Sequence, residues 1–193
     1  MKYCSNCGDS VAMKIPAGDN RERHVCDTCD TIHYQNPKIV AGCVPIWQEK
    51  VLLCRRAIQP RYGLWTLPAG FMENGESTAQ AAARETLEEA NAVVENLTLY
   101  GLYNLVHISQ VYLMFRGDLK DGQASAGEES LEVGLFTEDE IPWQELAFPV
   151  VKETLQRYFE ERQHGIYQVH AGDILRNNDG GVVIRRHNRK DNN

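Results

Sequence analysis

The stretch Gly70–Ala92, GFMENGESTAQAAARETLEEANA, is the feature that most constrains the fold of this chain. Ser77 is a favoured N-cap residue, and Gln80 follows it by three positions, which is the spacing of a capping box. The alanine-rich run that comes next has high helix propensity. We therefore predict a loop followed by a helix over Thr78–Ala90.

Three carboxylates of this helix point in a similar direction. At about 100° per residue, Glu85, Glu88 and Glu89 fall within one sector of the helix. The small residues form another face, which we expect to pack: Ala79, Ala82, Ala83, Thr86 and Ala90. Like charges one turn apart repel each other, and a hard divalent cation such as Mg²⁺ or Mn²⁺ would remove that repulsion by binding carboxylate oxygens. The alternative is a solvated acidic helix without a site.

The same stretch resembles the signature of the Nudix hydrolase family. The matching residues are Gly70, Glu76, Arg84, Glu85, Glu88 and Glu89, all at the spacing of the family. Three positions depart from the signature: Thr86 replaces an aliphatic residue, Asn91 replaces a glycine, and Ala92 is smaller than usual. Asn is the second choice after Gly for the left-handed residue that ends a helix, so we expect Asn91 to keep the turn.

The resemblance implies an α/β fold, the Nudix α/β/α sandwich with a mixed sheet. It makes Glu85, Glu88 and Glu89 ligands of Mg²⁺ or Mn²⁺, with a backbone carbonyl from Gly70. Arg84 is expected to orient a carboxylate rather than to compete for the metal. In several branches a carboxylate of a later loop is a metal ligand or general base, and the candidates here are Glu129 and Glu132. A solvated charge run is the alternative for both.

Two CxxC pairs lie near the N-terminus, separated by eighteen residues: Cys4, Cys7, Cys26 and Cys29. This spacing predicts a zinc ribbon, in which four thiolates fill a tetrahedral site and leave no position for water, so that Zn²⁺ is structural. Residues 1–34 are too few to fold on a core alone, and the metal would supply the folding free energy. Two disulfides are the alternative. We expect His24 and His33 to be ordinary surface residues, and Cys43 and Cys54 to be small core residues.

The order of patterns along the chain predicts three parts: a zinc ribbon (1–34), a Nudix hydrolase domain (35–163) and a C-terminal tail (164–193). The expected strands are Ile39–Trp47, Val51–Arg55, Leu97–Tyr103, Gln110–Leu119 and a short one ending at Phe136. Asp121–Gly127 has the composition of a flexible loop. A second helix opens at Phe148-Pro149. From His164 the chain becomes Asn- and Gly-rich, which indicates a partly ordered tail or a segment that packs on a dimer partner.

Candidates for substrate binding come from the residues before and within the signature: Arg55, Arg56, Tyr62, Phe71 and Glu76. Neighbouring residues of a strand point to opposite faces, so one of Arg55 and Arg56 can reach substrate phosphates. Aromatic residues such as Tyr62, Phe71, Tyr103 or Phe148 can stack on a base, although a core role is the more common one.

Composition bounds the class of protein. With 193 residues, a formal charge of −7 and 42% hydrophobic residues, the chain is long enough for one core and a small appendage. The longest apolar run, Ile39–Trp47, is too short to span a bilayer, and no apolar signal region precedes Cys4, so a cytoplasmic location is the expectation. The acidic balance, which includes residues 1–34, argues against nucleic acid as a partner and favours packing or dimer formation for the ribbon.

The combination of ribbon, Tyr34–Pro37 and signature resembles the zinc-ribbon Nudix proteins over residues 3–163. One branch cleaves NADH and carries a Ser-Gln-Pro-Trp-Pro-Phe-Pro run, of which this chain has just Ser109-Gln110. A second branch cleaves FAD and ADP-ribose, and the phrases Gly63–Gly70 and Glu129–Glu132 look closer to it. The resemblance therefore implies a pyrophosphatase that releases AMP from FAD or ADP-ribose, and it also implies a homodimer. The alternatives are an NADH pyrophosphatase and an ADP-ribose-sensing regulator, against which the complete set of carboxylates counts.

Overall fold

The chain divides into two compact units in the computed structural model, which describes residues 1–177 and 179–187. We call Met1–Pro37 the N-terminal unit and Lys38–Asn193 the C-terminal unit. The N-terminal unit contains a three-stranded antiparallel sheet: β1 (Val11–Lys14), β2 (Arg23–Cys26) and β3 (Ile32–His33).

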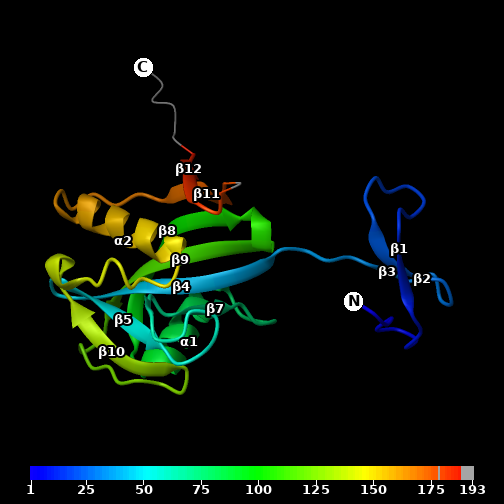
Figure 1. The fold of residues 1–193 in the computed structure, drawn as a ribbon. Coiled ribbons are helices and arrows are strands. Elements are labelled where there is room, and N and C mark those ends of the chain that lie inside the picture. Colours follow the sequence, from blue (N-terminus) through cyan, green and yellow to red (C-terminus); the bar gives the residue numbers. More distant parts are fainter. Residues whose placement is uncertain (178, 188–193) are drawn as a thin grey trace. The chain divides into compact units, whose positions relative to one another are not determined.

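In its described residues, the C-terminal unit is built on one mixed sheet with two α-helices (Figure 1). Its strands are β4 (Lys38–Trp47), β5 (Lys50–Arg56), β6 (Trp65–Thr66), β7 (Ala69–Phe71), β8 (Val94–Leu105), β9 (Gln110–Leu119), β10 (Ser130–Phe136), β11 (His170–Arg176) and β12 (Val182–Arg186). Its helices are α1 (Thr78–Ala90), α2 (Pro149–Arg162) and the short 3₁₀ helices η1 (Val106–Ile108) and η2 (Glu138–Glu140).

The strand order is β10-β5-β4-β9-β8-β11-β12, with β6 added to β5 and β7 added to β4. The β4–β9 and β8–β11 pairs are parallel, and the other pairs are antiparallel. Figure 1 shows α1 and α2 on opposite faces of this sheet. The expected α/β/α sandwich with a mixed sheet is therefore confirmed.

Alternation along β5 explains how one sheet supports two cores. Leu52 and Cys54 belong to the cluster under α1, whereas Val51 and Leu53 belong to the cluster under α2. Successive side chains of a strand point to opposite faces, so a continuous apolar run fits a strand that is covered on both sides. Cys54 and Cys43, which belong to the same cluster, are fully buried, which confirms that they are core residues.

Helix α1 begins and ends at the predicted residues. The Ser77 and Gln80 side chains form the capping box, and Asn91 takes the left-handed conformation (φ 46°, ψ 34°) that was expected to end the helix. The Thr86 hydroxyl, where the signature has an aliphatic residue, is buried and donates to the Ala82 carbonyl at 2.8 Å. The departures at Thr86 and Asn91 therefore leave the helix intact.

The separation of α1 into a packed face and a charged face is only partly right. Glu85 and Glu89 are themselves buried, with exposed fractions of 9% and 6%. Ala79 and Ala83 are only partly buried, although they pack against the core as expected. The carboxylate sector lies at the border of the packed face, because β7 and the loop after residue 121 cover it.

Residues 170–177 and 179–186 differ most from expectation, because the sequence indicated a tail over 164–193, of which residues 178 and 188–193 lie outside the described residues. They form the hairpin β11–β12, and β11 pairs in parallel with β8 from His170 to Asp173. Ile174 is buried in the core under α2. The sheet supplies the hydrogen-bonding partner that stabilises this polar segment as strands.

The other expected elements are present with shifts of a few residues. Strands β4, β5, β9 and β10 and helix α2 lie where the patterns placed them, and β8 extends beyond the predicted strand at both ends. Phe148 is the N-cap of α2 and Pro149 its first residue. Among the described residues, no helix is both long enough and apolar enough to cross a membrane.

Candidate active site

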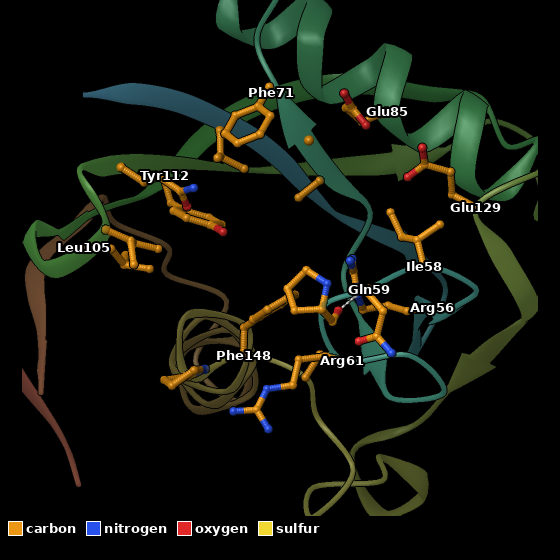
Figure 2. A pocket seen from close by; sticks show the side chains of 18 of the residues that line it. Arg56, Ile58, Gln59, Arg61, Phe71, Glu85, Leu105, Tyr112, Glu129 and Phe148 are labelled. Carbon is orange, nitrogen blue, oxygen red and sulfur yellow. Dashed lines mark hydrogen bonds between the residues drawn. The ribbon is translucent and has the colours of Figure 1, made fainter. Parts of the chain in front are cut away.

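A cavity of about 1170 Å³ opens in the C-terminal unit. Its acidic wall comes from α1 and the segments beside it: Glu73, Glu85, Glu88, Glu89, Glu128 and Glu129. Facing this wall are Arg56, Arg61 and Phe148, as Figure 2 shows. The volume slightly exceeds the range of about 300–1,000 Å³ usual for small-molecule sites, so an extended ligand fits.

Burial acts on two carboxyl groups of the acidic wall, Glu89 and Glu85. It raises the pKa of Glu89 to about 8, with a further contribution from the neighbouring Glu85 carboxylate. Burial also raises the pKa of Glu85, although Arg84 acts in the opposite direction. Burial disfavours the charged form of both carboxyl groups, and a bound cation would favour it. The carboxylates therefore favour a cation at this end of the cavity.

Arg84 organises the carboxylates around it. Its Nη1 donates to Glu85 at 2.7 Å and to Glu88 at 2.9 Å, while its Nε and Nη2 donate to Glu76 at 3.0 and 2.8 Å. Arg84 holds the pKa of Glu76 down at about 2, with help from the Glu73 backbone amide. Glu76 is thus a partner of Arg84, and it is not among the residues that line the cavity.

Two glycines allow the backbone to approach the carboxylates. A Cβ at Gly70 would lie 2.3–2.4 Å from the Glu85 carboxylate, so a larger residue there would displace that carboxylate. A Cβ at Gly127 would lie 1.8 Å from the Glu88 carbonyl oxygen. The Gly127 amide donates to Glu89 O at 3.0 Å. This hydrogen bond holds the next two residues, Glu128 and Glu129, at the cavity.

The segment Asp121–Gly127 was expected to be a flexible loop, but the structure anchors it to the end of α1. The Ser125 amide donates to Ala90 O at 2.9 Å, and the Asn91 side chain donates to the carbonyls of Ser125 and Ala126. The residue that replaces the signature glycine therefore has a second role. It fixes the loop that carries the acidic pair Glu128-Glu129.

The donor set of the acidic wall fits a hard divalent cation, since it consists of carboxylate oxygens with the Gly70 backbone beside them. Its geometry is not closed around one point. Among residues 1–177 and 179–187, the four cysteines are the one group of three or more His, Cys, Asp or Glu whose ligand atoms all lie within 4.8 Å of one another. Arg84 binds Glu85 and Glu88 of this wall, and water and substrate oxygens would have to complete a metal site.

The wall opposite the carboxylates is cationic and aromatic. The Arg56 guanidinium lies 5.1 Å from the centre of the Phe148 ring, and its Nε donates to Pro60 O at 2.9 Å (Figure 2). Arg61 and Gln59 project from the same loop. A guanidinium stacked on an aromatic face keeps its outer N–H groups free to bind phosphate.

The structure brings some of the predicted substrate and base residues to the cavity and not others. Arg56, Phe71, Phe148 and Glu129 line it. Arg55 points to the other side of β5, where it donates to Glu132 at 2.9 Å and to Gly63 O at 2.8 Å, and neither partner of this ion pair lines the cavity. Two of the proposed stacking residues are also elsewhere, because Tyr62 is 56% exposed outside the cavity and Tyr103 is buried in the core.

The sequence did not indicate several lining residues. Tyr112 and Gln110 come from β9, Leu105, His107 and Ile108 from the end of β8 and η1, and Ile174, Arg176 and Val182 from the C-terminal hairpin. Alternation along β9 could have placed Gln110 and Tyr112 on one face, but not at a site. The hairpin gave no signal, because its contribution depends on pairing with β8.

A second cluster lies in the N-terminal unit. The sulfurs of Cys4 and Cys29 are 3.7 Å apart and those of Cys7 and Cys26 are 3.4 Å apart, with all four cysteines unbridged. Tetrahedral zinc with Zn–S bonds of about 2.3 Å needs sulfurs roughly 3.8 Å apart, so the cluster fits Zn²⁺ and the disulfide alternative does not hold. His33, expected to be an ordinary surface residue, places Nε2 3.3 Å from the Cys4 sulfur.

A helix bearing carboxylates, packed on a mixed sheet beside a cavity, is the architecture of a Nudix fold. A family model described as NUDIX domain matches residues 36–158, and one described as Nudix N-terminal, a zinc ribbon, matches residues 2–35. The first match covers more than half of the 193 residues. The chain belongs to the NUDIX family.

Relatives agree with this assignment. The chain is 28% identical over 145 residues to an NAD-capped RNA hydrolase NudC of Vibrio vulnificus, a match covering 74% of this chain and 53% of that protein. It is 29% identical over 121 residues to an ADP-ribose pyrophosphatase of Methanocaldococcus jannaschii, covering 60% and 69%. The chain spans about half the length of the NAD-capped RNA hydrolases that it matches. A crystal structure of a NUDIX hydrolase from Nitrosomonas europaea is 58% identical, covers 90% of this chain and 99% of that one, and superposes with a TM-score of 0.87.

Proposed function

We propose that this protein is an Mg²⁺- or Mn²⁺-dependent pyrophosphatase that hydrolyses the diphosphate bridge of a nucleoside diphosphate derivative and releases AMP. One observation carries the proposal: a single cavity has a wall of carboxylates from α1 opposite a wall with Arg56 and Phe148. The first wall suits a divalent cation, and the second suits a phosphate and a base. A diphosphate lying between them would meet both.

Each group has a role in this proposal. Glu85, Glu88 and Glu89 would hold the cation, which when bound neutralises phosphate oxygens and favours in-line attack by water. Arg84 orients Glu85 and Glu88, as its hydrogen bonds at 2.7 and 2.9 Å indicate. Arg56 donates to phosphate oxygens on the opposite wall.

The proton balance of the reaction requires a base. Water adds to one phosphorus while the bond from that phosphorus to the bridging oxygen breaks, so the products are two phosphate monoesters. Glu129 lines the cavity opposite Arg56 and is our candidate to accept the proton of the attacking water. Glu132 is no longer favoured for this role, because it is paired with Arg55.

The substrate proposal is a nucleotide linked through its diphosphate to a second moiety. ADP-ribose and FAD were favoured by sequence, and the relative named ADP-ribose pyrophosphatase supports the first of them. The relatives named NAD-capped RNA hydrolase support NADH or NAD-linked nucleotides as a second candidate. They also weaken the expectation that nucleic acid is not a partner. Formation of a homodimer and a cytoplasmic location stay predictions.

The metals are proposed from the donor sets. Zn²⁺ suits the four cysteine sulfurs as a structural ion, because no position is left for a substrate. Mg²⁺ or Mn²⁺ suits the carboxylates of the cavity. Exchange of the divalent cation in the assay would set the preference between Mg²⁺ and Mn²⁺, while zinc content stays constant.

The Glu89→Gln variant tests the proposed function. It removes a carboxylate that would bind the cation, and we expect turnover to fall by about 10²–10⁴-fold with the fold retained. The measurement is phosphate release by a coupled phosphatase from ADP-ribose, FAD and NADH, with circular dichroism as a check of folding. The matched control is Glu95→Gln, an exposed carboxylate of β8 outside the cavity, which should have wild-type turnover.

Two outcomes would overturn the proposal. A folded Glu89→Gln protein with wild-type turnover would remove the carboxylate wall from the chemistry. A wild-type protein that binds ADP-ribose but hydrolyses none of the three compounds with Mg²⁺ or Mn²⁺ would favour the ligand-sensing regulator instead.

A further inference from the structure

The cavity has an end that the proposed chemistry does not use. In Figure 2 it lies around Leu105, across the cavity from Glu85 and Glu129. Its lining is mainly aliphatic, with one imidazole and one guanidinium: Leu105, His107, Ile108, Ile174, Arg176 and Val182. We call these six residues the distal end. Half of them come from the hairpin β11–β12, which lies beyond the part of the chain matched by the NUDIX family model.

Alternation along the hairpin explains how it forms both core and cavity wall. Ile174 pairs with Ile184, and Arg176 pairs with Val182, so these four side chains share one face. Ile174 and Ile184 pack in the core under α2. The same face continues past the core to Arg176 and Val182, which line the cavity.

The hairpin is held in place by charged contacts. Arg186 on β12 donates to both oxygens of the buried Glu153 on α2, at 2.9 and 3.1 Å. Asp173 on β11 accepts from Asn104 of β8 at 2.9 Å and contacts His187 at 3.1 Å. These contacts make the hairpin a preformed wall of the cavity.

We propose that the distal end determines specificity by binding a planar ring on the half of the substrate that is remote from AMP. The inference rests on the proposed function. Aliphatic walls favour a ring over a hydroxyl-rich sugar, because burying hydroxyls without partners is costly. The Arg176 guanidinium provides donors for an acceptor group at the edge of that ring. The preferred substrate class is then a dinucleotide with rings at both ends.

NADH and ADP-ribose form a suitable substrate pair, because NADH carries a dihydronicotinamide ring where ADP-ribose ends in the free ribose. We expect Val182→Asp to lower the ratio of kcat/KM for NADH to that for ADP-ribose by about 10-fold, since a short carboxylate would stand against the ring. Arg176→Ala should lower the same ratio, and FAD should follow NADH.

The matched control is Val183→Asp. Val183 is the next residue of β12, is similarly exposed (41% against 45% for Val182), and points to the face that does not line the cavity. This variant introduces the same charge in the same strand, so its substrate ratio should equal that of the wild-type protein. Thermal melts of both Asp variants would show whether the hairpin stays folded.

Binding separates this inference from the proposed function. The dissociation constants of NADH and of ADP-ribose are measured by calorimetry without added divalent cation. If the wild-type protein hydrolyses neither compound but Val182→Asp weakens NADH binding more than ADP-ribose binding, the proposed function fails and the distal end stands. If hydrolysis occurs and both Val182→Asp and Arg176→Ala keep the wild-type ratio and affinities, the distal end is not a specificity site.

Discussion

The two places of this molecule that suit metal ions differ in how complete they are. In the N-terminal unit the four sulfurs already lie within 4.8 Å of one another. In the C-terminal unit Arg84 binds Glu85 and Glu88 of α1, and no three carboxylates of its described residues place oxygens within 4.8 Å of one another. The four sulfurs form a complete donor set without substrate, as a structural site requires. The carboxylates leave positions for water and phosphate oxygens.

The burial around each place agrees with this distinction. Within residues 1–37, all of which the structure describes, the buried residues are Cys4 and Cys26. The C-terminal unit instead has an apolar cluster on each face of its sheet. We therefore expect the N-terminal unit to depend on an ion for folding, and the C-terminal unit to fold without one.

Removal of the ion from the four cysteines should have the largest effect. We expect the N-terminal unit to lose on the order of 10 kcal/mol, because metal binding is its folding free energy, and so to unfold. The C-terminal unit should keep its structure. Amide NMR spectra are recorded before and after chelation, and for Cys26→Ser. Chelation and the substitution should each remove the folded-state signals of residues 1–37 alone.

The matched control for that experiment is Cys54→Ala. Cys54 is a fully buried thiol like Cys26, but it lies in the core under α1, and burial raises its pKa. The variant should keep the zinc content of the wild-type protein. If the N-terminal unit remains folded without metal, its own core is sufficient for folding. The proposed difference between the two units would then be wrong.

The second effect concerns Arg84, which donates hydrogen bonds to two of the proposed metal ligands. In Arg84→Ala, Glu85 and Glu88 lose the donor that orients them. Loss of such outer contacts typically costs 10–100-fold, and here we expect turnover to fall by about 100-fold, with a higher Mg²⁺ concentration needed for half-maximal rate. Rates measured over a series of Mg²⁺ concentrations give both quantities.

Arg157 on α2 is the matched control. It also bridges two carboxylates of its helix, Glu153 and Glu160, and its side chain is 20% exposed compared with 24% for Arg84. Arg157→Ala should lower thermal stability and leave the Mg²⁺ dependence unchanged. If both arginine variants shift the Mg²⁺ dependence equally, Arg84 acts through the stability of the fold and not through the site.

The sequence was sufficient wherever the signal is local. The capping box, the left-handed Asn91 and the cysteine spacing each depend on residues close in the chain, and all three are found in the structure. Local patterns also indicated that Arg55 and Arg56 point to opposite faces. They could not show which of the two faces the cavity, because this depends on which side of β5 is covered.

The choice between Glu129 and Glu132 shows the same limit. As a charge run the two are equivalent, and the register between β10 and β5 separates them. Glu132 lies opposite Arg55 and pairs with it, whereas Glu129 precedes the strand and lines the cavity. The hairpin β11–β12 was missed for a related reason, since β11 is stabilised by pairing with a strand far away in the sequence.

The smallest effect concerns His33, which lies beside the four-cysteine site and should modify its zinc affinity. Its Nε2 lies 3.3 Å from the Cys4 sulfur, so an N–H there would donate to the thiolate. We expect His33→Ala to weaken zinc binding by about 10-fold, the lower end of the range for such outer contacts. Competition with a chelator of known affinity measures this change.

His24 provides the control, because it lies opposite His33 in the β2–β3 pair and its Nε2 contacts the amino group of Met1 instead of a sulfur. His24→Ala should keep the wild-type zinc affinity. Equal losses in the two variants would mean that the small sheet, and not the hydrogen bond to Cys4, sets the affinity. Packing would then contribute to the N-terminal unit as it does to the C-terminal one, and the contrast between the two metal sites would be one of degree.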